Sequence, residues 1–138
     1  MGAPLMAFVS DNSVIVAWLI PDQANDYTRR MDRRAAREQP VVPALWEPEF
    51  ANVITVLVRR GVLARHHADA ILSRVERLQL AVDRAAVLPR ALFELADRHG
   101  ISAYDAAYLE LAQRRGLPLA TRDTRLARVA RAAGMLLR

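Results

Sequence analysis

Four acidic residues stand out because each lies at the border between an apolar segment and an expected helix. They are Asp11, Glu49, Asp105 and Asp123, and their spacing is far too wide for a local calcium-binding loop of the EF-hand kind. Such acids can form a site only if the fold brings distant segments together. If it does, a divalent cation must neutralise them, and an oxygen-only ligand set suits Mg²⁺ or Mn²⁺ rather than zinc.

The overall charge and the missing residue types narrow the chemistry. All 20 basic residues are arginines and the formal net charge is +5, so the surface can attract a polyanion. The absence of lysine excludes Schiff-base chemistry and Walker-type phosphate binding, and the absence of cysteine excludes disulfides and thiolate ligands. A divalent cation can activate water and clamp a phosphate in line. Together these features suggest phosphodiester hydrolysis.

The two acids nearer the N-terminus, Asp11 and Glu49, can also be explained by simple structural roles. Asp11 follows an apolar run and fits an Asx turn or a helix cap, with Ser13 as the expected N-cap of the next helix. Glu49 fits a favourable acid at a helix N-terminus, as Glu47 does. Alternatively, Glu49 is partly buried and needs a partner, and Asn52 at i+3 on the same helical face is placed to orient it.

The two later acids have capping explanations as well. Ser102-Ala103-Tyr104-Asp105 matches the capping-box pattern at the head of a helix. Asp123 lies between an expected strand and an expected helix, where a cap is common. Capping leaves unexplained why all four acids occur at strand ends and helix starts. That joint pattern favours a site.

The elements that must position these acids alternate between short strands and helices. Strands are expected at 5–10, 41–42, 80–82, 117–120 and 135–137. Helices are expected at 14–20, 23–38, 45–60, 64–79, 89–99, 102–115 and 124–133. This alternation predicts an α/β fold with a parallel sheet covered on both faces, and ligands of such sheets bind at the carboxyl ends of the strands. The helix at 45–60 is so apolar that we expect it to be buried on most of its circumference.

Length and composition predict a single domain covering residues 1–138. Hydrophobic residues make up 53% of the chain and charged residues 25%, which is typical of a globular domain. The opening segment 1–5 has no basic leader, and no stretch approaches the roughly 20 apolar residues of a membrane span. We therefore expect a soluble cytoplasmic protein with no membrane partner.

The ordered set of acidic segments resembles the PIN-domain family, specifically the VapC-type toxins of bacterial toxin–antitoxin pairs. The matching segments are Asp11-Asn12-Ser13-Val14 with Ala17-Trp18-Leu19, Pro43-Ala44-Leu45-Trp46 with Glu49-Phe50-Ala51-Asn52, Ser102-Ala103-Tyr104-Asp105-Ala106-Ala107-Tyr108-Leu109, and Leu117-Pro118-Leu119-Ala120-Thr121-Arg122-Asp123. They follow the family order from one end of the chain to the other. Asn12 is a mild departure, because small residues are frequent at that position.

The resemblance implies a PIN-like three-layer α/β/α sandwich and a Mg²⁺-dependent endoribonuclease, in which Mn²⁺ could replace Mg²⁺. It implies that Asp11, Glu49, Asp105 and Asp123 form the active site, and that Asp11 and Asp105 are the usual metal ligands. Glu49 and Asp123 would then act as weaker or water-mediated ligands, with Ser13, Asn52 and Thr121 in support. The implied partners are an RNA substrate, a VapB-type antitoxin and a second copy of the chain.

Two other interpretations account for some of the same residues. A receiver domain also gathers acids at strand ends, but receivers use a late lysine and paired early acids, and this chain has neither. The other alternative is a catalytically inactive PIN-like module that binds RNA or protein through its arginines. The arginines at 29, 30, 33, 34 and 37 would form a stripe for that purpose, although most such stripes are solvated helix faces.

Overall fold

The computed structural model describes residues 6–138 and shows a four-stranded parallel sheet. Its strands are β1 (Ala7–Ser10), β2 (Gln39–Pro43), β3 (Ala81–Asp83) and β4 (Leu119–Ala120), in the order β3-β2-β1-β4. Val9 pairs in register with Val41 on one side and with Leu119 on the other, so β1 is central. The predicted parallel sheet is therefore confirmed, while residue 5 of the first expected strand lies outside the described residues.

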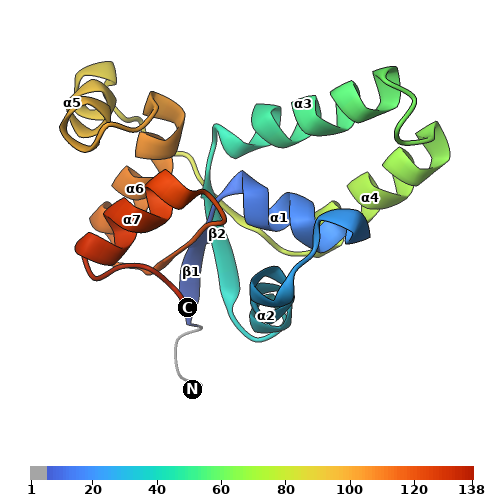
Figure 1. Cartoon of the computed structure of the whole chain (residues 1–138), viewed down its shortest axis with the longest axis horizontal. Helices are drawn as coiled ribbons and strands as arrows, with labels where there is room; N and C mark the ends of the chain where they lie inside the picture. The colour runs from blue at the N-terminus through green and yellow to red at the C-terminus, as the bar shows by residue number, and fades with distance from the viewer. Residues whose placement is uncertain (1–5) are drawn as a thin grey trace.

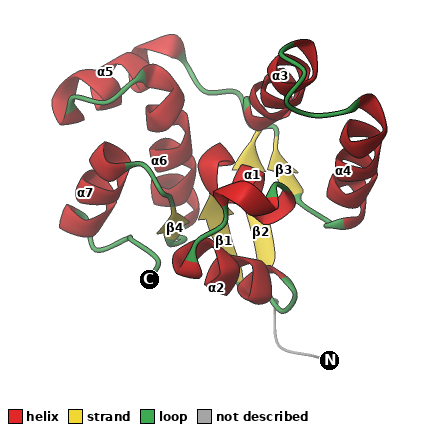
Figure 2. Ribbon diagram, turned by 45° about the vertical axis from the view of Figure 1, so that its right-hand side comes forward, coloured by secondary structure: helices red, strands yellow, loops and turns green. Residues whose placement is uncertain are grey.

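Within the part of the chain that the structure describes, seven α-helices lie around the sheet in two groups. They are α1 (Asn12–Leu19), α2 (Asp26–Ala35), α3 (Trp46–Arg59), α4 (Arg65–Arg77), α5 (Pro89–His99), α6 (Ala103–Arg115) and α7 (Thr124–Ala132), with a short 3₁₀ turn at Pro21–Gln23. Figure 1 shows α5, α6 and α7 on one side of the strands and α1 to α4 on the other. Figure 2 shows the sheet between these layers, which makes the predicted three-layer α/β/α sandwich. Among the described helices, none is long and apolar enough to cross a membrane.

The strands are short apolar runs because both of their faces are covered. Phe8, Val9, Val41, Val42 and Leu119 have no exposed surface. A strand buried on both faces loses the alternation of apolar and polar residues that marks a half-exposed sheet. Helix α6 packs directly on β1 and β2, and α5 and α7 pack on α6.

Local signals fix the ends of the helices close to their predicted positions. Ser102 is the N-cap of α6, and Gly100 and Gly116 end α5 and α6 in the left-handed conformation with φ of 65° and 64°. A side chain at φ > 0 is strained, so glycine is the favoured residue at these two positions. The N-cap of α1 is Asp11 rather than Ser13, since the Asp11 side chain accepts a hydrogen bond from the Val14 amide.

Two other expectations are wrong. Helix α3 buries only Trp46, Phe50 and Ile54 within the described chain, because this i, i+4, i+8 stripe alone faces the core. Its other apolar side chains are half-buried or exposed. The expected strand at 135–137 is reduced to an isolated bridge between Leu119 and Leu136.

Candidate active site

Asp11 is the most deeply buried of the four acids. It lies at the end of β1 and is only 5% exposed. Its Oδ1 accepts hydrogen bonds from the Ser13 hydroxyl at 2.6 Å and the Val14 amide at 3.2 Å, and its Oδ2 accepts one from the Thr121 hydroxyl. Burial raises the pKa of Asp11 to about 6, although these hydrogen bonds act in the opposite direction.

The bonds around Asp11 join the two ends of the chain. Thr121 follows β4 and contacts Asp11, while the Arg122 amide donates to the Ser13 hydroxyl at 3.2 Å. The Thr121 hydroxyl also accepts a hydrogen bond from the Asp123 amide at 2.9 Å. Thr121 therefore connects the acid that follows β1 to the acid that follows β4.

Glu49 lies in the first turn of α3 and is held from the opposite helix layer. Its Oε1 accepts a hydrogen bond from the Tyr108 hydroxyl of α6 at 2.6 Å. Burial and the nearby charge of Asp105 raise the pKa of Glu49, against the lowering effect of the Tyr108 hydrogen bond. Asn52 is exposed, and within residues 6–138 no hydrogen bond joins it to Glu49. The partner that Glu49 needs is thus Tyr108, which the sequence reasoning missed although Tyr108 lies at i+3 from Asp105.

Asp105 and Asp123 both sit at helix starts, as the capping patterns predicted. The Asp105 amide donates to the Ser102 hydroxyl at 3.0 Å. The Asp123 Oδ1 caps α7 by accepting from the Leu126 amide at 2.8 Å. Burial and the charge of Asp123 raise the pKa of Asp105, while the Ser102 side chain lowers it.

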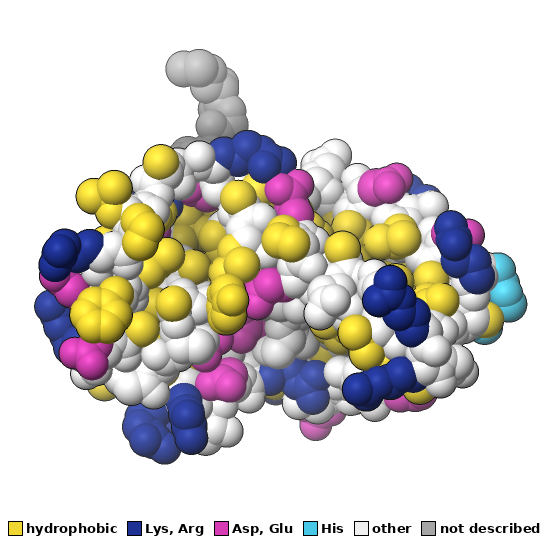
Figure 3. Space-filling view, turned by 90° about the horizontal axis from the view of Figure 1, so that it is seen from above, with side chains coloured by type: hydrophobic (Ala, Val, Ile, Leu, Met, Phe, Trp, Pro, Cys, Tyr) yellow, Lys and Arg dark blue, Asp and Glu magenta, His cyan; other side chains and the backbone are white. Residues whose placement is uncertain are grey.

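The electrostatics show that the fold brings the four acids into one neighbourhood. The charge of Asp105 raises the pKa of both Asp11 and Glu49, and the charge of Asp123 raises that of Asp105. The effect of one carboxylate on the pKa of another grows as the two come closer and as less water lies between them. In the view from above, acidic side chains gather in the middle of this face, between the two helix layers (Figure 3).

Within the described residues no arginine neutralises these acids, even though the whole chain has 20 arginines. Of the ion pairs within residues 6–138, none involves any of the four. By contrast, Arg114 binds both Asp83 and Glu110, at 3.0 and 2.7 Å. The arrangement is an excess of negative charge at the carboxyl edge of the sheet, which is what a divalent cation would offset.

The donor set fits Mg²⁺ better than a metal that needs a complete protein cage. Among residues 6–138, no three histidine or acidic side chains are arranged closely enough to enclose an ion. Mg²⁺ keeps several waters and is usually bound through one or two carboxylates, so it does not require such a cage. Asp11 and Asp105 could supply those carboxylates, and Glu49 and Asp123 could act through the retained waters.

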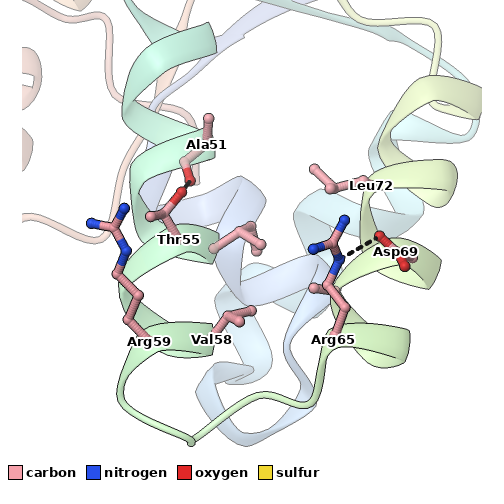
Figure 4. Close-up of a pocket in the computed structure, with 9 residues that line it drawn as sticks. Ala51, Thr55, Val58, Arg59, Arg65, Asp69 and Leu72 are labelled. Atoms are coloured by element: carbon pink, nitrogen blue, oxygen red, sulfur yellow. Dashed lines mark hydrogen bonds and ion pairs between the residues drawn. The ribbon is translucent and has the colours of Figure 1, made fainter.

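A groove lies between α3 and α4, away from the four acids. This groove has a volume of about 310 Å³ and contains none of the four carboxylates. It is lined by Ala51, Ile54, Thr55, Val58, Arg59, Arg65, Ala68, Asp69 and Leu72. Figure 4 shows the apolar side chains between the two helices, with Arg59 on one and the Arg65–Asp69 pair on the other.

Residues 8–132 match the family model described as PIN domain. A curated relative, Ribonuclease VapC3 of Pyrobaculum aerophilum, is 32% identical over 124 residues, covering 88% of this chain and 93% of the relative. Ribonuclease VapC3 of Mycobacterium tuberculosis is 30% identical over 126 residues, covering 91% and 89%.

Two solved structures have the same fold. PAE2754 from Pyrobaculum aerophilum superposes with a TM-score of 0.65 at 23% identity, covering 92% of this chain and 87% of that one. FitAcB from Neisseria gonorrhoeae gives a TM-score of 0.64 at 22% identity, covering 91% and 94%. At these identities the likeness concerns the fold alone.

Proposed function

Because this chain belongs to the PIN-domain family, we propose that it is a Mg²⁺-dependent endoribonuclease and the toxin of a VapBC-type toxin–antitoxin pair. Two relatives at 30% identity or more are named ribonucleases, and each match covers most of both chains. The observation that carries the proposal is the group of four acids at the carboxyl edge of the sheet, which has no arginine partner among residues 6–138. Mn²⁺ would serve as a substitute cation.

The proposed roles follow from how each acid is held. Asp11 and Asp105 would be direct ligands, since Asp11 is fixed by three hydrogen bonds and Asp105 by the start of α6. Glu49 and Asp123 would act through water or a second, weaker site. A bound Mg²⁺ supplies Lewis-acid activation of water and neutralisation of the phosphate. The carboxylates would hold the cation and accept hydrogen bonds from the attacking water.

The reaction is hydrolysis of an RNA phosphodiester. A water oxygen forms a bond to phosphorus, the bond from phosphorus to a ribose oxygen breaks, and the proton lost by the water ends on that oxygen. Arg122 is exposed and lies next to Asp123, and its guanidinium would contact a backbone phosphate of the RNA. No step requires a lysine or a cysteine, which this chain lacks.

The test is RNA cleavage by the purified chain with the substitutions Asp11→Asn and Asp105→Asn. Both variants should lose cleavage and growth arrest while remaining folded, and excess EDTA should silence the wild type. Asp97→Asn, which alters an exposed carboxylate on α5, is the matched control. Full activity in either active-site variant would refute the proposal. RNA binding that falls steeply with salt and ignores the acids would instead identify the catalytically inactive binding module.

The groove between α3 and α4 supports the proposed antitoxin partner. Val58 and Leu72 line this groove and remain partly accessible to solvent in the described chain. An amphipathic segment of a partner can bury such an apolar surface. Arg59 and the Arg65–Asp69 pair lie beside it and would select the charge of the bound segment. If a short reading frame lies immediately upstream of the gene, its co-expression with the wild type and with the variant Val58→Glu tests this. The variant should lose the partner and keep RNA cleavage.

The surface around α5 supports the proposed homodimer. Leu88, Phe93 and Tyr104 are each more than three-fifths exposed, and Figure 3 shows hydrophobic side chains gathered on that side of the acids. Monomeric proteins seldom leave clustered large apolar groups in water. A second copy that covers α5 would remove this exposure.

A further inference from the structure

Tyr108 links the two helix layers across the proposed metal site. Its hydroxyl donates to the Glu49 Oε1 at 2.6 Å, within the range of charge-assisted O–H···O⁻ bonds. Tyr108 belongs to α6 and Glu49 to α3, which Figure 1 shows on opposite sides of the strands. The bond therefore fixes the distance between a carboxylate of one layer and the helix that carries Asp105 in the other.

The burial of Tyr108 stabilises this hydrogen bond. The side chain is only 2% exposed and belongs to the same core cluster as Leu109 and Ala106. A buried hydroxyl without a partner is costly, so the tyrosine is held to its acceptor. A tyrosine hydroxyl is protonated at neutral pH, so Tyr108 acts as the donor in this bond.

The bond also leaves only one carboxylate oxygen of Glu49 free to bind a ligand. Oε1 is occupied by Tyr108, whereas no donor among residues 6–138 forms a hydrogen bond to Oε2. Free rotation of the carboxylate about its last bond would exchange the two oxygens. The Tyr108 hydroxyl opposes that exchange.

We propose that Tyr108 is a positioning residue of the metal site, which holds Glu49 so that a single oxygen, Oε2, faces the cation or its bound water. This rests on the proposed function, because it assigns a role at the same site. Partners that orient metal-binding side chains in this way typically change metal affinity about 10–100-fold when removed. The competing explanation is that Tyr108 only fills the core and satisfies its own hydroxyl.

Mn²⁺ and Mg²⁺ affinity, measured by calorimetry on the full chain, separates these explanations. Tyr108→Phe keeps the ring in the core and removes only the donor, and we expect metal binding about 10–100-fold weaker. Tyr104→Phe is the matched control, because Tyr104 lies on the same helix and is 63% exposed. It should bind metal as the wild type does.

A double-mutant cycle with Glu49→Gln shows whether Tyr108 acts through Glu49. If it does, Tyr108→Phe will have little further effect on metal affinity in the Glu49→Gln background, whereas independent effects would multiply. Lower thermal stability of Tyr108→Phe with unchanged metal affinity would overturn the inference alone. Absence of Mg²⁺ and Mn²⁺ binding by the wild type would overturn the proposed function and this inference together.

Discussion

Replacing Asp11 by Asn should stabilise the metal-free protein at pH 8. The folded chain holds the Asp11 proton more tightly than the unfolded chain does, because burial raises the pKa to about 6 from an ordinary value of 3.8. Between these values the folded state binds more protons, so the stability of the wild type falls as the pH rises through this range. Above this range the folded protein carries a buried carboxylate without a cation, and the Asp11→Asn substitution removes that charge.

The size of the effect follows from the two pKa values. Their difference, from 3.8 to about 6, is about 2 units and corresponds to about 3 kcal/mol at a pH above both. Asn is as good an N-cap as Asp, so α1 keeps its first hydrogen bond. We therefore expect Asp11→Asn to unfold at a Tm about 5–10 °C higher than the wild type at pH 8, with the difference disappearing near pH 4.

Thermal and urea denaturation in EDTA at pH 8, 6 and 4.5 measure this directly. Asp97→Asn should not differ from the wild type at any of these pH values. Mg²⁺ at about 1,000 times its Kd should then reverse the order at pH 8, because it stabilises the wild type by about 4.1 kcal/mol and the variant has lost a ligand. This gain exceeds the advantage of about 3 kcal/mol that the variant has in EDTA. The reasoning fails if Asp11→Asn is less stable than the wild type at pH 8 in EDTA, or if its advantage is independent of pH.

Three further predictions concern the hydrophobic core, the end of α6 and the exposed surface of α5. Leu109→Ala removes a side chain with no exposed surface from the centre of α6 and should cost about 2–5 kcal/mol in urea unfolding; a loss below about 1 kcal/mol would contradict this packing. Gly116→Ala should cost about 1–2 kcal/mol from backbone strain alone, since a Cβ there would meet no atom within 4 Å; a neutral result would mean that the left-handed turn is not required. Phe93→Glu should convert a dimer into a monomer by light scattering while leaving the far-UV circular dichroism unchanged, and an unaltered mass would remove α5 from the interface.

The fold was largely predictable because its signals are local. Helix α5 spans 89–99 as expected, since Pro89 and Gly100 mark its ends in the sequence itself. Helix α3 was expected in the right place, but its burial was predicted wrongly for the opposite reason. A run of apolar residues indicates that these side chains are to be shielded from water. It does not indicate whether the same chain or a partner shields them. In α3, only three side chains are buried by other described residues.

The structure places Ser13 and Thr121 against Asp11, as the resemblance implied, but the contact between Glu49 and Tyr108 was not predicted. The positions of Asp11 and Asp123 follow from strand ends that the pattern of apolar residues reveals. The bond between Tyr108 and Glu49 joins residues 59 positions apart on two different helices, and it depends on how α3 and α6 cross the sheet. A buried tyrosine at i+3 from Asp105 was the only signal, and such residues are usually part of the core.

Capping and metal binding are complementary roles at this site, and the helix starts explain why. Helices α1, α3, α6 and α7 all begin at the acids: Asp11 and Asp123 are N-caps, and Glu49 and Asp105 lie in first turns. Each helix start carries about +0.5 elementary charge, so four together offset about two of the four carboxylate charges. About two negative charges then remain, which one divalent cation would neutralise. The helix starts thus help the metal-free chain to tolerate four acids that no arginine of residues 6–138 pairs with.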